Sequence, residues 1–280
     1  MSLLNKTQEL CQLYDLKPKH SHGQNFLITE QVYEDIVGAA KLVDSDNVLE
    51  VGPGLGFLTT RLAQAVNKVT AVELDAELFG VLKVILTSLD ISNIDLINQN
   101  VLDFNPDDLP VGYKIVANLP YNITSVFLRK FLNANNKPDQ MTLMLQKEVA
   151  ERIAAKPGNH SMLSLSVQFY AEPEIMRLVD KTDFWPAPKV NSAVLNIKIK
   201  PEKDLPFSES EQKDFFRLLK FGFSSKRKML KNNLAGAFRK TSIELGAVLE
   251  QAGFKPSVRA QELSLLDWQT LFAQLKQFMV

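Results

Sequence analysis

The sequence has few of the residues that build disulfide frameworks or metal centres. Its 280 residues include one cysteine, Cys11, and three histidines, so an intrachain disulfide is excluded and no metal-ligand spacing occurs. No apolar run approaches the length that crosses a membrane, and the first twenty residues lack the basic and then apolar order of a secretory signal. These absences predict a cytoplasmic protein that works without a metal.

Net charge is also absent from the chain as a whole, but it is unevenly distributed. Residues 201–280 hold 13 basic and 9 acidic side chains, a net charge of +4, whereas the remainder holds 19 and 23, a net charge of −4. A neutral total therefore hides a basic C-terminal part, which is the distribution expected where one part of a chain meets nucleic acid.

Apolar runs alternate with helical patterns between about residues 47 and 146. The runs are NVLEVG, KVTAVEL, IDLINQ, YKIVANL and MTLMLQ, and the intervening helices are expected near 57–66, 75–88 and 123–133. This order predicts an α/β fold with a Rossmann-like parallel sheet and helices on both faces. Two further strands are expected at SLSVQFYA and SAVLNIKIK.

After PEKDLPFSES the pattern becomes helical to the end of the chain. We therefore expect two domains, a catalytic domain over residues 1–203 and a small all-helical domain over residues 204–280.

The first predicted strand runs into a glycine turn that suits a nucleotide cofactor. Gly52 and Gly54 let the backbone approach a ligand closely, but the dinucleotide pattern would require glycine where Phe57 stands, which disfavours an NAD-dependent oxidoreductase. Glu73 ends the next strand, where a carboxylate can accept both ribose hydroxyls. Asn100 follows the third strand, near the expected adenine edge, although simple turn chemistry would also explain it.

The tetrapeptide Asn118-Leu119-Pro120-Tyr121 follows the fourth predicted strand. The Asn118 side-chain oxygen and the Leu119 carbonyl can both accept N–H bonds, and Pro120 has no N–H to compete for them. Tyr121 offers a face on which a base can stack. The tetrapeptide therefore suits the exocyclic amine of a flat heterocycle, with an ordinary strand-ending turn as the alternative.

Five motifs in order resemble one known family. They are HSHGQNFL, VLEVGPGLGFLT, AVELD, NLPY and FWPAPKVNSAV. Together they resemble the S-adenosylmethionine-dependent rRNA adenine N6,N6-dimethyltransferases, and most closely the bacterial type that dimethylates two adjacent adenosines near the 3′ end of 16S rRNA. The resemblance implies S-adenosyl-L-methionine as the cofactor and 16S rRNA in the 30S subunit as the substrate.

The resemblance also implies roles for individual residues. Asn25 and Leu27 would close over the methionine end of the cofactor, Gly52 would line its turn and Glu73 would hold its ribose. The family usually has Asp where this chain has Asn100, so we expect weaker binding of the cofactor's adenine amine, because an amide forfeits the charge-assisted part of the bond.

At the target base, the resemblance implies that Asn118 bridges cofactor and amine while Tyr121 and Phe184 sandwich the adenine. For Phe184 alone, a core aromatic would be the plainer interpretation. His22 stands where an apolar residue is common in the family, and we have no physical account of that change.

A positive cluster in the C-terminal part is a candidate for phosphate contacts. It comprises Lys226, Arg227, Lys228 and Lys231. A run of basic residues is usually a solvated helix face, but the family resemblance favours contact of this cluster with RNA.

Three other functions remain open at this point. The chain could methylate 23S rRNA adenine, could methylate DNA adenine, or could be a ribosome-assembly binding factor with weak methylation. DNA enzymes usually carry Pro where this chain has Leu119, which argues against the second. We expect a monomer.

Overall fold

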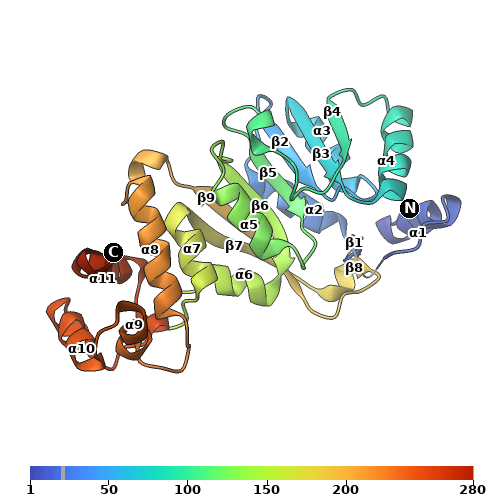
Figure 1. Ribbon diagram of the computed structural model, residues 1–280. Helices are drawn as coiled ribbons and strands as arrows, with labels where there is room; N and C mark the ends of the chain where they lie inside the picture. Colours follow the sequence, from blue (N-terminus) through green and yellow to red (C-terminus); the bar gives the residue numbers. More distant parts are fainter. Residues whose placement is uncertain (20–22, 280) are drawn as a thin grey trace. The chain divides into compact units, whose positions relative to one another are not determined.

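The computed structural model describes residues 1–19 and 23–279, and the chain divides into two compact units (Figure 1). The first unit comprises residues 1–150 and 172–199, and the second comprises residues 151–171 and 200–280. In the described residues, no helix has both the length and the apolar character needed to span a membrane.

The first unit is built on a seven-stranded sheet with the order β4-β3-β2-β5-β6-β9-β7. The strands are β2 (Asn47–Val51), β3 (Lys68–Glu73), β4 (Ile94–Asn98), β5 (Lys114–Asn118), β6 (Gln140–Gln146), β7 (Ala171–Val179) and β9 (Ser192–Ile199). Neighbouring strands from β4 to β6 are parallel, whereas β9 pairs antiparallel with β6. The central strands are almost fully buried, which explains their continuous apolar sequences.

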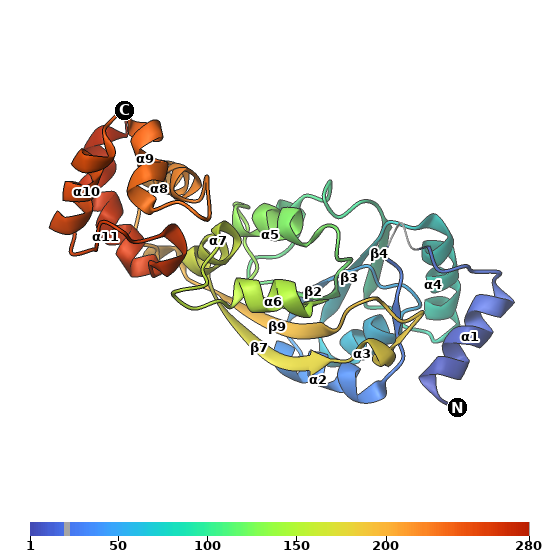
Figure 2. The ribbon, with the colours of Figure 1, turned by 90° about the horizontal axis from the view of Figure 1, so that it is seen from below.

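Helices cover both faces of this sheet, and Figure 2 shows α2 and α5 on opposite sides. The helices of this unit are α1 (Leu3–Leu13), α2 (Glu30–Ala40), α3 (Phe57–Ala65), α4 (Ala76–Ser88) and α5 (Thr124–Leu132), and α6 (Lys147–Ile153) runs from it into the second unit. The helices α2 to α5 each bury an apolar stripe, which in α5 includes Phe127, Leu128 and Phe131. The short 3-10 helices are η2 (Pro106–Asp108) and η3 (Lys181–Asp183).

A separate two-stranded ribbon joins distant parts of the sequence. β1 (Phe26–Leu27) pairs antiparallel with β8 (Phe184–Trp185), so that Leu27 lies opposite Phe184. Both side chains are buried in the core that α2 and α3 form with the sheet. The ribbon thereby fixes the segment that follows Gly23.

The second unit is helical. It contains α7 (Met162–Tyr170), α8 (Glu209–Gly222), α9 (Leu230–Phe238), α10 (Ser242–Gln251) and α11 (Leu265–Leu275), with η4 (Glu202–Asp204), η5 (Ala260–Glu262) and η6 (Lys276–Phe278). Its core is aromatic: the Phe169 ring lies 5.4 Å from that of Phe215 and 6.1 Å from that of Phe207. These contacts place α7 with the C-terminal helices.

The structure confirms the α/β fold, the five strands expected between residues 47 and 146 and the three helices between them. The strand expected at 164–171 is wrong, because this run forms α7. Ser161 caps the helix by accepting from the Ser164 backbone N–H at 3.2 Å, and the Ser164 hydroxyl bonds back to the Ser161 N–H. The strand β7 follows instead, with Glu172 and Glu174 exposed at the sheet's edge.

The two compact units also differ from the expected division at residues 203 and 204. Residues 151–171 belong to the helical unit although they precede two strands of the sheet. The order of the sequence did not indicate that residues 151–171 belong to the helical unit. The chain enters that unit, returns to the sheet for β7 and β9, and then enters the helical unit again.

Candidate cofactor and adenine site

Four parallel strands end at one edge of the sheet and bring the predicted motifs together. From β2 the chain passes through α3 to β3 on one side, while β5 pairs with the other side of β2. Ligands of open α/β sheets bind at such a switch point, outside the carboxyl ends of the strands. A cavity lies there, lined by residues that follow β2, β3, β4 and β5.

Ten of the predicted site residues line this cavity. They are Asn25, Leu27, Gly52, Gly54, Glu73, Asn100, Asn118, Leu119, Pro120 and Tyr121. Phe184 is not among the lining residues; its side chain is 3% exposed and packs in the core. Its stacking role therefore stays a prediction, and the structure shows only that it pairs with the cavity residue Leu27 in the β1–β8 ribbon.

The glycine turn and Glu73 are linked by hydrogen bonds. Gly54 has a φ of +58°, a conformation that suits glycine, and its N–H donates to Glu73 Oε2 at 3.1 Å. The Asp75 N–H donates to Glu73 Oε1 at 2.8 Å. Burial raises the pKa of Glu73, and these backbone bonds oppose the rise by stabilising its charge. The carboxylate is thus held in a fixed position at the end of β3.

The Asn118 side chain is oriented from across the cavity. Its Nδ2 donates to the Asn25 carbonyl at 3.5 Å, which leaves Oδ1 as the acceptor of this amide. The Leu119 N–H donates to the Met144 carbonyl at 3.2 Å, so the tetrapeptide is fastened to β6. The Tyr121 hydroxyl lies 2.7 Å from Ser192 Oγ, which fixes the ring at the cavity wall.

Asn100 makes a turn contact and also lines the cavity. Its Oδ1 accepts from the Leu102 N–H at 3.0 Å, which is an Asx turn, and its side chain also lines the cavity. An amide oxygen has two lone pairs, so the turn does not exhaust its capacity to accept a further bond. The proposed contact with an adenine amine is compatible with this turn.

Glu50 is a cavity residue that the sequence reasoning missed. It lies in β2, is 1% exposed, and its Oε2 has no hydrogen-bond partner among the described residues. Burial raises its pKa to about 8, the neighbouring Thr59 hydroxyl opposes this rise, and the charge of Glu73 adds to it. The available signal was a carboxylate inside the otherwise apolar strand Val48–Val51.

Two carboxyl groups beside one cavity favour a ligand that carries positive charge. A pyrophosphate would be repelled by a charged Glu73 and would keep Glu50 protonated, whereas a cation would favour the ionised form of both carboxyl groups. A positively charged nucleotide cofactor therefore suits this cavity better than a dinucleotide does.

The basic cluster lies in the second unit. Lys226, Arg227 and Lys228 are exposed in the turn between α8 and α9, and Lys231 is half-buried on α9. Within the described part of the chain these four side chains form no ion pair. Asn233 fixes the turn, because its Nδ2 donates to the carbonyls of Gly222 at 2.6 Å and Ser225 at 2.9 Å.

Comparisons with known proteins agree with the family resemblance found in the sequence motifs. The sequence matches the family described as ribosomal RNA adenine dimethylase over residues 16–277. Proteins named ribosomal RNA small subunit methyltransferase A are similar to it. The one from Dehalococcoides mccartyi (strain CBDB1) is 41% identical over 273 residues, covering 96% of this chain and 92% of that protein. The one from Streptococcus pneumoniae (strain Taiwan19F-14) is 37% identical over 284 residues, covering 96% of each.

Two solved structures share the fold over 90% of this chain. A dimethyladenosine transferase from Plasmodium falciparum superposes with a TM-score of 0.77 at 23% identity, with 98% of its chain covered. The 23S rRNA methyltransferase ErmE superposes with a TM-score of 0.75 at 28% identity, with all of its chain covered.

The fold and the cavity therefore define a Rossmann-like methyltransferase. The chain belongs to the ribosomal RNA adenine dimethylase family. The resemblance found in the motifs is confirmed, and with it the enzyme class, an S-adenosylmethionine-dependent rRNA adenine dimethyltransferase.

Proposed function

We propose that the protein dimethylates N6 of two adjacent adenosines near the 3′ end of 16S rRNA. The observation that carries the proposal is the orientation of Asn118, whose amide donates to the Asn25 carbonyl and presents an acceptor oxygen at the carboxyl end of β5. The name small subunit methyltransferase A, which belongs to relatives similar over nearly the whole chain, supports 16S rather than 23S rRNA.

The cofactor of this reaction is S-adenosyl-L-methionine. In the proposed complex Glu73 accepts the ribose hydroxyls, Asn100 accepts from the adenine amine, and Gly52 and Gly54 let the backbone approach. Asn25 and Leu27 cover the methionine end. When bound, the cofactor supplies an electrophilic methyl group on a sulfonium. Glu50 would face this cation, whose charge would offset the cost of burying a carboxyl oxygen without a partner.

The chain itself contributes positioning. Asn118 Oδ1 and the Leu119 carbonyl each accept a hydrogen bond from the N6 amine of the target adenine. These two bonds would turn the nitrogen lone pair toward the methyl group. Pro120 has no N–H that could compete for these acceptors. Tyr121, which lines the cavity, and Phe184, which pairs with Leu27, would stack on the two faces of the adenine ring. The target base must leave its stack to reach this cavity.

RNA contacts beyond the target base are assigned to the basic cluster. Lys226, Arg227, Lys228 and Lys231 would neutralise backbone phosphates of 16S rRNA within the 30S subunit. The helical domain that carries them is expected to bind rRNA while residues of the first domain act on the base. A monomer working in the cytoplasm, where small subunits are assembled, completes the proposal.

Methyl transfer from labelled S-adenosylmethionine tests this function. The protein is incubated with undermethylated 30S particles, with 23S rRNA and with duplex DNA, and the products are mapped. Dimethyladenosine at adjacent 16S positions is expected. Transfer to 23S rRNA alone would refute the substrate, and tight 30S binding without transfer would indicate an assembly factor.

The same assay tests the role of Asn118. Asn118→Ala is expected to lose at least about 100-fold in turnover, since a positioned polar group of this kind contributes several kcal/mol to the transition state. Asn135→Ala, at an exposed position outside the cavity, is the control and should be unchanged. Near-normal turnover of Asn118→Ala would remove the proposed role.

A further inference from the structure

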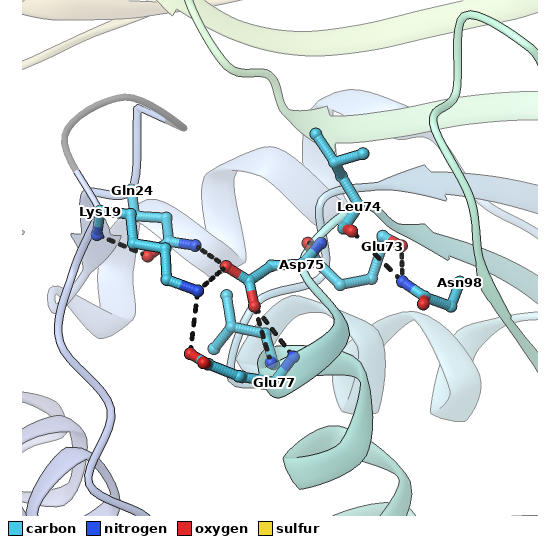
Figure 3. Close-up of polar contacts among 8 residues, drawn as sticks. Lys19, Gln24, Glu73, Leu74, Asp75, Glu77 and Asn98 are labelled. Atoms are coloured by element: carbon cyan, nitrogen blue, oxygen red, sulfur yellow. Dashed lines mark hydrogen bonds and ion pairs between the residues drawn. The ribbon is translucent and has the colours of Figure 1, made fainter.

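An ionic cluster joins residues 23–27, which form one wall of the cavity, to the turn between β3 and α4 (Figure 3). Lys19 Nζ lies 2.9 Å from Asp75 Oδ2 and 2.9 Å from Glu77 Oε2. Gln24 Nε2 donates to the same Asp75 oxygen at 3.0 Å, and its Oε1 accepts from the Lys19 N–H at 2.7 Å. We call these four residues the clasp.

Asp75 joins the clasp to the candidate ribose site. Its Oδ1 caps α4 by accepting from the N–H groups of Glu77 at 3.0 Å and Leu78 at 3.3 Å, and its own N–H donates to Glu73. Burial raises the pKa of Asp75, but the bonds from Lys19, Gln24 and the backbone outweigh it and lower the pKa to about 2. The carboxylate is therefore charged at every working pH.

The other end of the clasp is the cavity wall, residues 23–27. Gln24 and Asn25 line the cavity, and the Asn25 carbonyl accepts from Asn118. Further along, the Leu27 carbonyl accepts from the Tyr33 hydroxyl at 3.0 Å. The clasp thus anchors the beginning of the wall, whereas the β1–β8 ribbon anchors its end.

We propose that Asp75 is a positioning residue that, through Lys19 and Gln24, docks the wall against the cavity and so sets the affinity for the cofactor. This inference rests on the proposed function of the cavity. An undocked wall lacks the correctly placed Asn25, and the apparent dissociation constant rises in proportion as the docked fraction falls. Once the cofactor is bound it holds the wall itself, so turnover at saturation is preserved.

The test compares Lys19→Met and Asp75→Asn with Asp95→Asn. Asparagine retains an oxygen for the helix cap, so Asp75→Asn removes the charge and replaces the oxygen that accepts from Lys19 and Gln24 with an N–H donor. Asp95, whose side chain is 55% exposed and pairs with Lys68, is the matched control for loss of an ion pair in the same sheet. Equilibrium binding of S-adenosylmethionine and S-adenosylhomocysteine, amide hydrogen exchange of residues 23–27, and kcat at saturating cofactor are measured.

Both clasp variants are expected to raise the dissociation constant about fivefold or more, with kcat at saturation within about twofold of wild type. Exchange of the wall amides should become faster, and Lys19→Arg should restore all three values. Because the Lys19 side chain is 37% exposed, added salt should weaken binding to the wild type more than to Lys19→Met.

Unchanged dissociation constants in both clasp variants would overturn the proposal, as would an equal loss of kcat at saturation. A fall in Tm without any change in binding would assign the clasp to stability alone and would also overturn it. A wild-type protein that does not bind S-adenosylmethionine would refute the proposed function, and the inference with it. Wild-type binding with unaffected variants would refute the inference alone.

Discussion

Replacing Glu50 with Gln should change how the stability of the protein depends on pH. Glu50 is 1% exposed, and its pKa is raised from the ordinary 4.5 to about 8, mainly by burial. The folded protein therefore keeps a proton that the unfolded chain releases. Since the native state binds more protons than the unfolded state between these two values, stability falls as pH rises through that range.

The size of the effect follows from the same two values. The interval from 4.5 to about 8 corresponds to about 5 kcal/mol in all, of which about 2–3 kcal/mol is lost between pH 5 and pH 7. Glutamine is neutral throughout and nearly isosteric, so the variant lacks this loss. The free energy of unfolding of Glu50→Gln, relative to wild type, should thus increase by about 2–3 kcal/mol over that interval.

Urea unfolding of the ligand-free protein at several pH values measures this difference. Glu9→Gln, at an exposed position on α1, is the control and should follow the wild-type curve. Parallel pH dependences for wild type and Glu50→Gln would refute the reasoning. We also expect the variant to bind S-adenosylmethionine more weakly, because a bound cation would favour ionisation of Glu50 and glutamine cannot become charged. Higher stability with lower affinity would identify Glu50 as a binding residue.

Three further predictions test other parts of the structure. Gly56→Ala should lower the free energy of unfolding by about 2 kcal/mol or more, because Gly56 has a φ of +82° and a Cβ there would lie 2.4 Å from Leu82 Cδ1. Chemical denaturation measures this loss. The control is Gly80→Ala, because the space around Gly80 is open. Phe184→Leu should raise the KM for RNA more than it raises the dissociation constant of the cofactor. Leucine is chosen because truncation of this buried ring to Ala would cost about 3–5 kcal/mol in stability. The reverse pattern in paired binding assays would remove the proposed role of Phe184 at the base. Reversing Lys226, Arg227 and Lys228 to Glu should weaken RNA binding and flatten its salt dependence by about 0.7 in logarithmic slope per lost phosphate contact; an unchanged slope would show that the turn does not meet the backbone.

The sequence was sufficient for most of the site because the site is built on consecutive parallel strands. The carboxyl ends of such strands meet at one edge, so residues that follow them are neighbours however far apart they lie in the chain. Gly52, Glu73, Asn100 and Asn118 each follow or end a strand recognised from its apolar run, and each lines the cavity. Their proximity required only strand order and direction.

Local pattern was least informative where a segment's surroundings decided its structure. The run at 164–171 has strand-like apolar content, but Ser161 and Ser164 cap a helix there and Phe169 packs into the aromatic core of the second unit. The edge strand β7, with its exposed glutamates, lacks the apolar continuity that identified the buried strands. The serine cap is a local signal, whereas the packing of Phe169 and the place of β7 in the sheet depend on residues distant in sequence.

The sequence by itself determined the fold class, the family and ten of the residues that line the cavity, because these follow from periodicity and from motifs that are continuous in the chain. The tertiary structure alone decided that Leu27 lies opposite Phe184, that Glu50 faces the cavity with an unpaired oxygen, and that Lys19 reaches Asp75. These are contacts between side chains on separate segments. They depend on how the layers pack, and packing is set by the whole chain rather than by any local pattern.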